Sequence, residues 1–253
     1  MISWTVALIS FGAVLTAYSF DRGYFKLARK SSASDDESQH ISGDITKAQA
    51  NDYNNDGEHA AIKVATQIDE SKTVRELTAS DEWAEIPFNV HMPEGANMEH
   101  SLLSHSLRGP NKLAVLPRVF VKKDKATVVS VFHVGKSLCG HKRVVHGGLI
   151  ATMFDELTAR PAMLNLPRNT GFTAYLHVNY RMPVFADQVV VVETSLDRIE
   201  DRKVYVKGVM KDVKGSVLND CEALFVSPKD TSMLPDNSRW IKKIDEYLGL
   251  QKA

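Results

Sequence analysis

The stretch RVVHGGLIATMFDELTAR, Arg143 to Arg160, places a histidine and two glycines ahead of an apolar run that carries two adjacent acids. On a helix of 3.6 residues per turn, residues 148–162 separate into two faces. The apolar face consists of Leu149, Ile150, Met153, Phe154 and Leu157. The opposite face sets one carboxylate among small residues: Gly148, Ala151, Thr152, Asp155, Thr158, Ala159 and Ala162. We therefore expect a helix from Gly147 to Met163 that packs on a sheet.

The two acids of this helix differ in their surroundings. Small neighbours allow a ligand or another backbone to approach Asp155, so we assign chemistry to this carboxylate. The alternative is a solvated acid on an exposed face. Glu156 lies at the boundary of the two faces, four residues before Arg160, where an exposed ion pair explains it.

The two glycines at the start of the helix suit an anion-binding role. The first amides of a helix have no partner within the helix and carry the positive end of its dipole. With Gly147 and Gly148 there, no side chain blocks the approach of a carbonyl oxygen or oxyanion. A tight strand-to-helix turn also favours glycine, and this is the alternative explanation.

The spacing of the two features predicts an oligomer. Gly147 and Asp155 are eight residues apart, which is about 12 Å along a helix axis, whereas reacting atoms must lie about 3–3.5 Å apart. One helix cannot present both groups to the same carbonyl, but two antiparallel copies can. The sequence therefore predicts a symmetric homodimer with two sites at its interface.

The flanking segments alternate as strands do. RVFVKKDKATVVSVFHVG (118–135) indicates a hairpin, and the runs QVVVVETSL, KVYVKGVMKDV and VLNDCEALFV indicate three more strands. In FTAYLHVNYRM one side comprises Phe172, Ala174, Leu176, Val178, Tyr180 and Met182, and the other Thr173, Tyr175, His177, Asn179 and Arg181. Two strands, one long helix and four more strands predict an α+β domain in which an antiparallel sheet carries a helix on one face.

The segments outside this domain have distinct compositions. Ile2 to Phe20 has no charged residue and is long enough to span a membrane. Basic residues follow it, which predicts that residues 1–22 form an uncleaved anchor with its flank on the cytosolic or matrix side. A cleaved targeting sequence is the first alternative and a buried core helix the second. We expect a basic flank and disordered acidic linker over 23–60, a helical and irregular extension over 61–110, the main domain over 111–228, and a tail with a short helix over 229–253.

Several functional classes find no support. The net charge is zero, so no nucleic-acid partner is predicted. The sequence contains no Walker loop, GxGxxG, CxxC or HExxH motif. Cys139 and Cys221 are too few for a disulfide framework and have no evident base. His133, His141 and His146 lack the spacing of metal ligands. We therefore predict neither a metal nor a cofactor.

Three segments together, LCGHKRVVHGGLIATMFDE, TAYLHVNYRMPVFADQ and EALFVSPK, resemble the hotdog-fold acyl-coenzyme A thioesterases. The similarity is greatest to the phenylacetate-pathway-like branch, which includes membrane-associated and mitochondrial fungal members. The resemblance covers about Asn111 to Pro228. It implies a hotdog fold, an antiparallel sheet wrapped around one long central helix. It also implies hydrolysis of acyl-CoA to a free carboxylic (fatty) acid and CoA, by a homodimer or dimer of dimers, in mitochondria rather than the endoplasmic reticulum.

The resemblance also implies roles for individual residues. Asp155 matches the acid that activates water or attacks the thioester, and Gly147 the amide that polarises the thioester carbonyl. His146 matches a histidine that positions this carbonyl, although it could simply cap the helix. Thr173 matches a hydroxyl that orients the water, although it could face solvent. The expected substrate-binding residues are Gly148, His141 and Asn179.

The sequence departs from the family pattern at two places. His141 stands near where some members carry an amide side chain. Pro161 lies inside the expected helix, which predicts a kink or an early end. A protein that binds acyl-CoA or lipid at a membrane without catalysis is therefore the second reading. A hydratase would need a different arrangement of aspartate and histidine.

Overall fold

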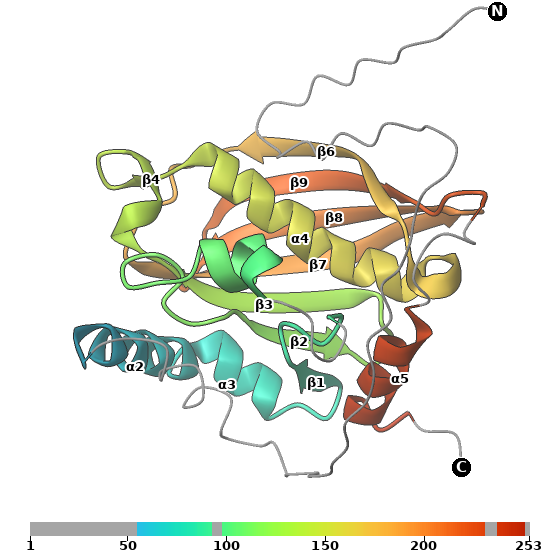
Figure 1. The fold of residues 1–253 in the computed structure, drawn as a ribbon, viewed down its shortest axis with the longest axis horizontal. Helices are drawn as coiled ribbons and strands as arrows, with labels where there is room; N and C mark the ends of the chain where they lie inside the picture. Colours follow the sequence, from blue (N-terminus) through green and yellow to red (C-terminus); the bar gives the residue numbers. More distant parts are fainter. Residues whose placement is uncertain (1–54, 93–97, 231–236, 251–253) are drawn as a thin grey trace, which may run out of the picture. The chain divides into compact units, whose positions relative to one another are not determined.

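A seven-stranded antiparallel sheet organises the residues that the computed structural model describes, which are 55–92, 98–230 and 237–250 (Figure 1). The strand order is β1-β2-β3-β7-β8-β9-β6. The strands are β1 (Trp83–Ile86), β2 (Arg118–Lys122), β3 (Thr127–Val134), β6 (Phe172–Tyr180), β7 (Gln188–Glu200), β8 (Lys203–Asp212) and β9 (Val217–Val226). A separate hairpin joins β4 (Cys139–His141) to β5 (Val144–Val145). The strands predicted after residue 118 are confirmed.

The long helix α4 (Gly147–Asn165) lies across one face of this sheet and contacts β3, β6, β7, β8 and β9 (Figure 1). All five residues of its predicted apolar face are buried. Burying such large apolar side chains stabilises the fold by about 1.5–3 kcal/mol each. The predicted α+β architecture, with the sheet around a central helix as in the hotdog fold, is confirmed.

The small-residue face of α4 is divided between the core and the surface. Thr158 and Ala162 are 0% exposed, and Ala162 packs with Val206, Ala223 and Phe225 of β8 and β9. This end of the face is therefore closed by the protein's own sheet. Asp155 remains half-buried, so the accessible part of the face is shorter than the pattern predicts.

Pro161 does not end α4, which continues to Asn165. The sequence predicts a kink or an early end at this residue, and of these two the early end is wrong. A proline has no N–H to donate to the carbonyl four residues earlier, which here belongs to Leu157. The hydroxyl of Thr194 on β7 lies 3.4 Å from this oxygen and 3.1 Å from the carbonyl oxygen of Val128. A neighbouring strand thus supplies a donor near the position where the helix lacks one.

Helices α2 (Asn55–Asp69) and α3 (Lys72–Thr78) contact β3 and β1, respectively. Residues 55–60, which the sequence assigns to a linker, are therefore helical. The cause is tertiary packing: Ala61, Val64 and Ile68 of α2 are buried with Phe120 and Val131 of the sheet. Burial of one apolar stripe stabilises a helix whose own propensity is weak.

The remaining helical segments are short. They are a 3-10 turn (Met98–His100), a π-helical turn (Leu102–Ser106), 3-10 turns at Lys136–Leu138 and Pro167–Asn169, and helix α5 (Ser238–Tyr247). The predicted membrane anchor at residues 1–22 lies outside the described residues. Within the part of the chain that the structure describes, no helix is long and apolar enough to cross a membrane.

Strand β6 lies at the edge of the sheet and pairs there with β9. Thr173 lies opposite Phe225 and Tyr175 opposite Leu224, so Ala174 is an extra residue in the strand. Such a β-bulge reverses the alternation of faces. Thr173 consequently shares a face with Leu176, which lies opposite Ala223. The predicted assignment of Thr173 and Leu176 to opposite faces is wrong.

Candidate active site

Asp155 and Thr173 are in direct contact. The Thr173 hydroxyl donates a hydrogen bond of 2.8 Å to Oδ1 of Asp155. This contact depends on the β-bulge, because regular alternation would turn Thr173 away from α4. Burial raises the pKa of the Asp155 carboxyl, the Thr173 hydrogen bond lowers it, and the nearby charge of Glu156 raises it, with a net rise. A carboxylate with a raised pKa is a better proton acceptor near neutral pH.

Two substitutions are expected to move the acidic limb of the activity profile in opposite directions. If Asp155 acts as a carboxylate, activity is lost as the pH falls through its pKa. Thr173→Val removes the bond that stabilises the charged form, so the pKa rises and the limb moves to higher pH. Glu156→Gln removes a neighbouring negative charge, so the pKa falls and the limb moves to lower pH. The measurement is the pH dependence of kcat/KM.

Thr173→Ser, which keeps the hydroxyl, is the matched control for this experiment and should leave the limb in place. Identical profiles for the wild type and Thr173→Val would show that the Asp155 carboxylate does not control the rate.

The start of α4 forms a second cluster. His146 caps the helix, its Nδ1 accepting a 2.9 Å hydrogen bond from the Gly148 amide. Because Nδ1 accepts, the neutral ring carries its proton on Nε2 and can donate from there. The Gly147 amide has no hydrogen-bond partner within the described part of the chain. Two donors, Gly147 N–H and His146 Nε2–H, are thus available at the positive end of the helix dipole.

The His146 ring fits where it does because its two neighbours Gly140 and Gly148 have no side chains. A Cβ on Gly148 would lie 3.0 Å from His146 Nδ1, and one on Gly140 would lie 2.9 Å from His146 Cδ2. The expected capping alternative for His146 is therefore confirmed, while its contact with substrate stays a prediction. The Gly148 amide is already bonded to His146, so the accessible donor of the pair of glycines is Gly147.

Gly148→Ala should reduce activity without reducing stability. Alanine favours a helix over glycine by about 1 kcal/mol, whereas its Cβ would press on the His146 ring. We expect kcat/KM to fall about tenfold, as positioning errors below 1 Å can, with an unchanged or higher melting temperature. Gly147→Ala should have a smaller effect, because its Cβ would meet the Tyr180 ring at an ordinary 3.5 Å. A melting temperature that falls together with activity would contradict this explanation.

Tyr180 is a site residue that the sequence analysis did not select. Its hydroxyl donates a 2.8 Å hydrogen bond to the carbonyl oxygen of Gly147. Burial raises the pKa of this phenol, so it stays protonated and can donate. The alternation of β6 already places Tyr180 on the face of Leu176 and Val178, which was the available signal. Tyr180 joins the edge strand to the first turn of α4.

The other predicted site residues lie elsewhere. His141 is exposed on the β4–β5 hairpin. Asn179 lies on the opposite face of β6 from Thr173, where its Nδ2 donates a 2.8 Å hydrogen bond to Asp220. Its Oδ1 lies 3.1 Å from His177 Nε2. The structure therefore brings Thr173 to Asp155 but does not bring Asn179 there.

Glu156 and Arg160 do not form the exposed ion pair that the sequence predicts. Arg160 Nη2 lies 3.8 Å from Glu156 Oε1, but the Arg160 side chain is only 7% exposed and donates to the carbonyl oxygen of Phe88. Its guanidinium also lies 4.4 Å from the centre of the Phe88 ring. Burial lowers the pKa of Arg160, and Glu156 raises it. The pair is therefore part of the packed structure.

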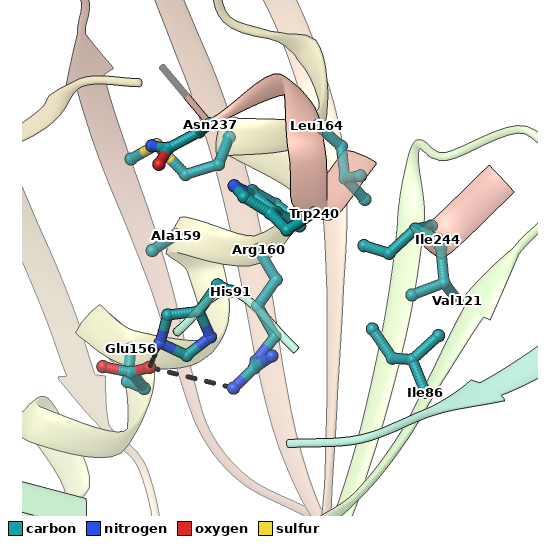
Figure 2. Close-up of a pocket in the computed structure, with 11 residues that line it drawn as sticks. Ile86, His91, Val121, Glu156, Ala159, Arg160, Leu164, Asn237, Trp240 and Ile244 are labelled. Carbon is teal, nitrogen blue, oxygen red and sulfur yellow. Dashed lines mark ion pairs between the residues drawn. The ribbon is translucent and has the colours of Figure 1, made fainter. Parts of the chain in front are cut away.

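Beside this arginine is a cavity of about 180 Å³ (Figure 2). Its lining is mainly apolar and comes from β1, β2, α4 and α5, together with His91 and Asn237 outside these elements: Ile86, His91, Val121, Glu156, Ala159, Arg160, Met163, Leu164, Asn237, Trp240 and Ile244. His91 lies 4.0 Å from Glu156. Burial and the neighbouring Arg160 lower the pKa of His91 to about 4, so the imidazole is neutral near pH 7. Ala159 brings this cavity within one helical turn of Asp155.

A cysteine nucleophile and a metal site are the other kinds of chemistry to consider in the described residues. Burial raises the pKa of the Cys221 thiol to about 12, so it remains protonated. Among residues 55–92, 98–230 and 237–250, no group of three or more His, Cys, Asp and Glu side chains could hold a metal ion. The chemistry that the site offers is that of a carboxylate, a hydroxyl and hydrogen-bond donors.

Fold and site together define a hotdog domain with a carboxylate on its central helix. The family model of the thioesterase superfamily matches residues 143–218. The acyl-coenzyme A thioesterase THEM4 of Xenopus laevis is 30% identical over 159 residues, covering 60% of this chain and 70% of that protein. The chain belongs to the thioesterase superfamily.

Two further similarities concern a yeast protein and a solved structure. FMP10, an uncharacterised mitochondrial membrane protein of Saccharomyces cerevisiae, is 32% identical over 124 residues, covering 48% of this chain and 51% of that protein. The crystal structure of RHA08564, a thioesterase superfamily protein, shares 22% identity with a TM-score of 0.40 and covers 47% of this chain and 61% of that chain. The chain thus spans about half the length of FMP10.

Proposed function

We propose that this protein hydrolyses acyl-CoA thioesters to a carboxylic acid and CoA. The observation that carries the proposal is the Asp155–Thr173 contact, a half-buried carboxylate with a raised pKa and one oxygen bound by a hydroxyl. Its second oxygen, Oδ2, is the one we assign to the proton of the attacking water. The water oxygen bonds to the thioester carbon, the C–S bond breaks, and the departing sulfur takes up a proton. Direct attack by Asp155 on the thioester is the second possible route.

The donors for the developing oxyanion are assigned to a second copy of the chain. Gly147 and Asp155 are separated by about 12 Å of helix, so one chain does not serve one carbonyl with both. Strand β6 supports a homodimer because it is an edge strand with exposed large side chains, Phe172 at 60% and Tyr180 at 53%. Antiparallel pairing of β6 with its copy would bring Thr173 toward the partner's Tyr180, and Asp155 toward the partner's Gly147.

The cavity beside Ala159 is assigned to the acyl group. It is lined mainly by apolar side chains and lies within one helical turn of Asp155. Its volume of about 180 Å³ equals about six water volumes. We therefore expect medium-length acyl chains to be hydrolysed faster than chains of about 16 carbons. Only the part of the acyl chain that fits inside the cavity is buried and contributes to the binding free energy.

A mitochondrial location and a membrane anchor are parts of this proposal. The similarity to FMP10, a mitochondrial membrane protein, supports mitochondria over the endoplasmic reticulum. The uncharged run from Ile2 to Phe20 supports an anchor, with the catalytic domain following its basic flank. Fractionation of a tagged full-length chain, with and without residues 2–20, tests both statements.

The experiment that tests the function is a hydrolysis panel. The purified full-length protein in detergent is assayed with saturated acyl-CoAs from 2 to about 18 carbons, and the released thiol is measured with a chromogenic disulfide. Turnover that depends on chain length supports the proposal. Absence of turnover together with saturable binding of acyl-CoA would identify a binding protein without catalysis, and the enzymatic proposal would be wrong.

A further inference from the structure

The β4–β5 hairpin lies beside the first turn of α4 (Figure 1). It borders a hollow of about 770 Å³. The hollow is lined by three cationic side chains, Lys136, Lys142 and Arg143, and by one carboxylate, Asp187. Three cations against one anion leave an excess of two positive charges in a chain whose net charge is zero. His141 lines the same hollow, and its ring can donate a hydrogen bond. Such a local excess attracts an anionic ligand.

The charges are not all used within the protein. Lys136 pairs with Asp187 at 3.1 Å. Lys142 and Arg143 are exposed, and neither has a carboxylate partner within the described part of the chain. Arg143 also adopts a left-handed backbone with φ of 65°, a conformation that costs energy for a residue with a side chain.

The hollow is held in a fixed position relative to the site. The Ala186 amide donates to the Arg143 carbonyl oxygen, and the Val145 amide donates to the Val184 carbonyl oxygen, both at 2.9 Å. Gly140, which lines the hollow, lies next to the His146 ring, since a Cβ added there would be 2.9 Å from His146 Cδ2. Because three residues of strand span about 10 Å, the tip of the hairpin lies within about that distance of His146 along the chain.

We propose that this hollow binds the phosphate groups of CoA, with Lys142 and Arg143 as their principal contacts. The inference rests on the proposed hydrolysis of CoA esters. CoA carries a diphosphate and a 3′-phosphate, separated from the thioester by the flexible pantetheine arm. That arm spans the distance from His146 to the hairpin tip. Arg143 can bind a phosphate through two parallel N–H bonds, and Lys142 adds a compact charge.

The test uses the full-length protein and the variant Lys142→Gln/Arg143→Gln, which removes both positive charges, keeps polar side chains and leaves the backbone hydrogen bonds of the hairpin available. Binding of CoA and of adenosine 3′,5′-bisphosphate is measured by calorimetry. We expect both affinities to fall about 10- to 100-fold in the variant, as loss of charge-assisted contacts does. The matched control is Lys123→Gln/Lys214→Gln, which removes two exposed lysines elsewhere and should bind both ligands as the wild type does. Equal affinities in the wild type and the hairpin variant would overturn the proposal.

A kinetic arm separates this proposal from the proposed function. The ratio of kcat/KM for an acyl-CoA to that for the same acyl ester of N-acetylcysteamine, which has no phosphate, should fall about 10- to 100-fold in the hairpin variant. An unchanged ratio in an active enzyme would contradict the proposed phosphate site, whereas the proposed thioesterase function would stand. If the wild type does not hydrolyse acyl-CoA but the hairpin variant binds CoA more weakly than the wild type, the proposed function would be wrong and the proposed phosphate site would stand. Displacement of CoA by inorganic phosphate as effectively as by the bisphosphate would show a simple phosphate site and contradict the assignment to CoA.

Discussion

Asp155→Asn should lower kcat/KM for acyl-CoA by about 10²- to 10⁴-fold, the usual contribution of a positioned general base. Asparagine has nearly the same shape as aspartate, and its carbonyl oxygen can still accept the hydrogen bond that Thr173 donates to Asp155 Oδ1. The substitution therefore removes the negative charge and the basic oxygen while preserving the contact between α4 and β6. Steady-state kinetics across the acyl-CoA panel provide the measurement.

The same substitution at a surface position isolates the effect of this site. Asp201→Asn changes an exposed residue in the turn between β7 and β8, with φ of 54°, a conformation that asparagine tolerates well. It should leave kcat/KM within about twofold of the wild type. An Asp155→Asn protein that folds, binds acyl-CoA and still turns over at the wild-type rate would show that another group activates the water.

The architecture could be predicted from the sequence because its signals are local. The apolar stripe of α4 and the alternation of the strands after residue 118 each report which side of an element is buried. Hence the sheet, the helix on its face and the family were predicted together. The early end that Pro161 offered as an alternative to a kink was wrong. Proline signals a helix end locally, whereas Thr194 from β7 lies near the carbonyl that the proline leaves without a donor.

The details of the site required the structure, because they depend on contacts between distant segments. The bulge at Ala174 leaves no signal in the alternation of β6, yet it turns Thr173 toward Asp155. Likewise, a glycine after His146 suggested open space for substrate, whereas Gly148 leaves room for the histidine ring itself. Arg160 appeared to be an exposed partner of Glu156 because sequence spacing does not report burial. Side-chain chemistry was therefore predictable in kind, and its geometry was not.

Mixed dimers should distinguish a shared site from a site within one chain. Asp155→Asn and His146→Ala each inactivate their own dimers. A heterodimer of the two, isolated with two affinity tags, contains one site with an intact Asp155 and an intact His146 if the site combines residues of both subunits. Such a heterodimer should recover about half of the wild-type activity, because a symmetric dimer has two equivalent sites. The gain over either parent would be at least about 50-fold if each parent retains no more than about 1% of its activity.

The reciprocal heterodimer is the matched control, with the wild type on one side and the double variant His146→Ala/Asp155→Asn on the other. In a shared arrangement both of its sites are defective, since each pairs one intact group with one missing group, and activity should stay at the level of the inactive parents. In an arrangement within one chain the expected results are reversed: this heterodimer keeps about half of the activity and the first one keeps none. The reversed result would contradict the geometric argument that Gly147 and Asp155 of one helix, about 12 Å apart, cannot act on one carbonyl. A protein that is active as a monomer would contradict it as well, since the partner's Gly147 would then be absent.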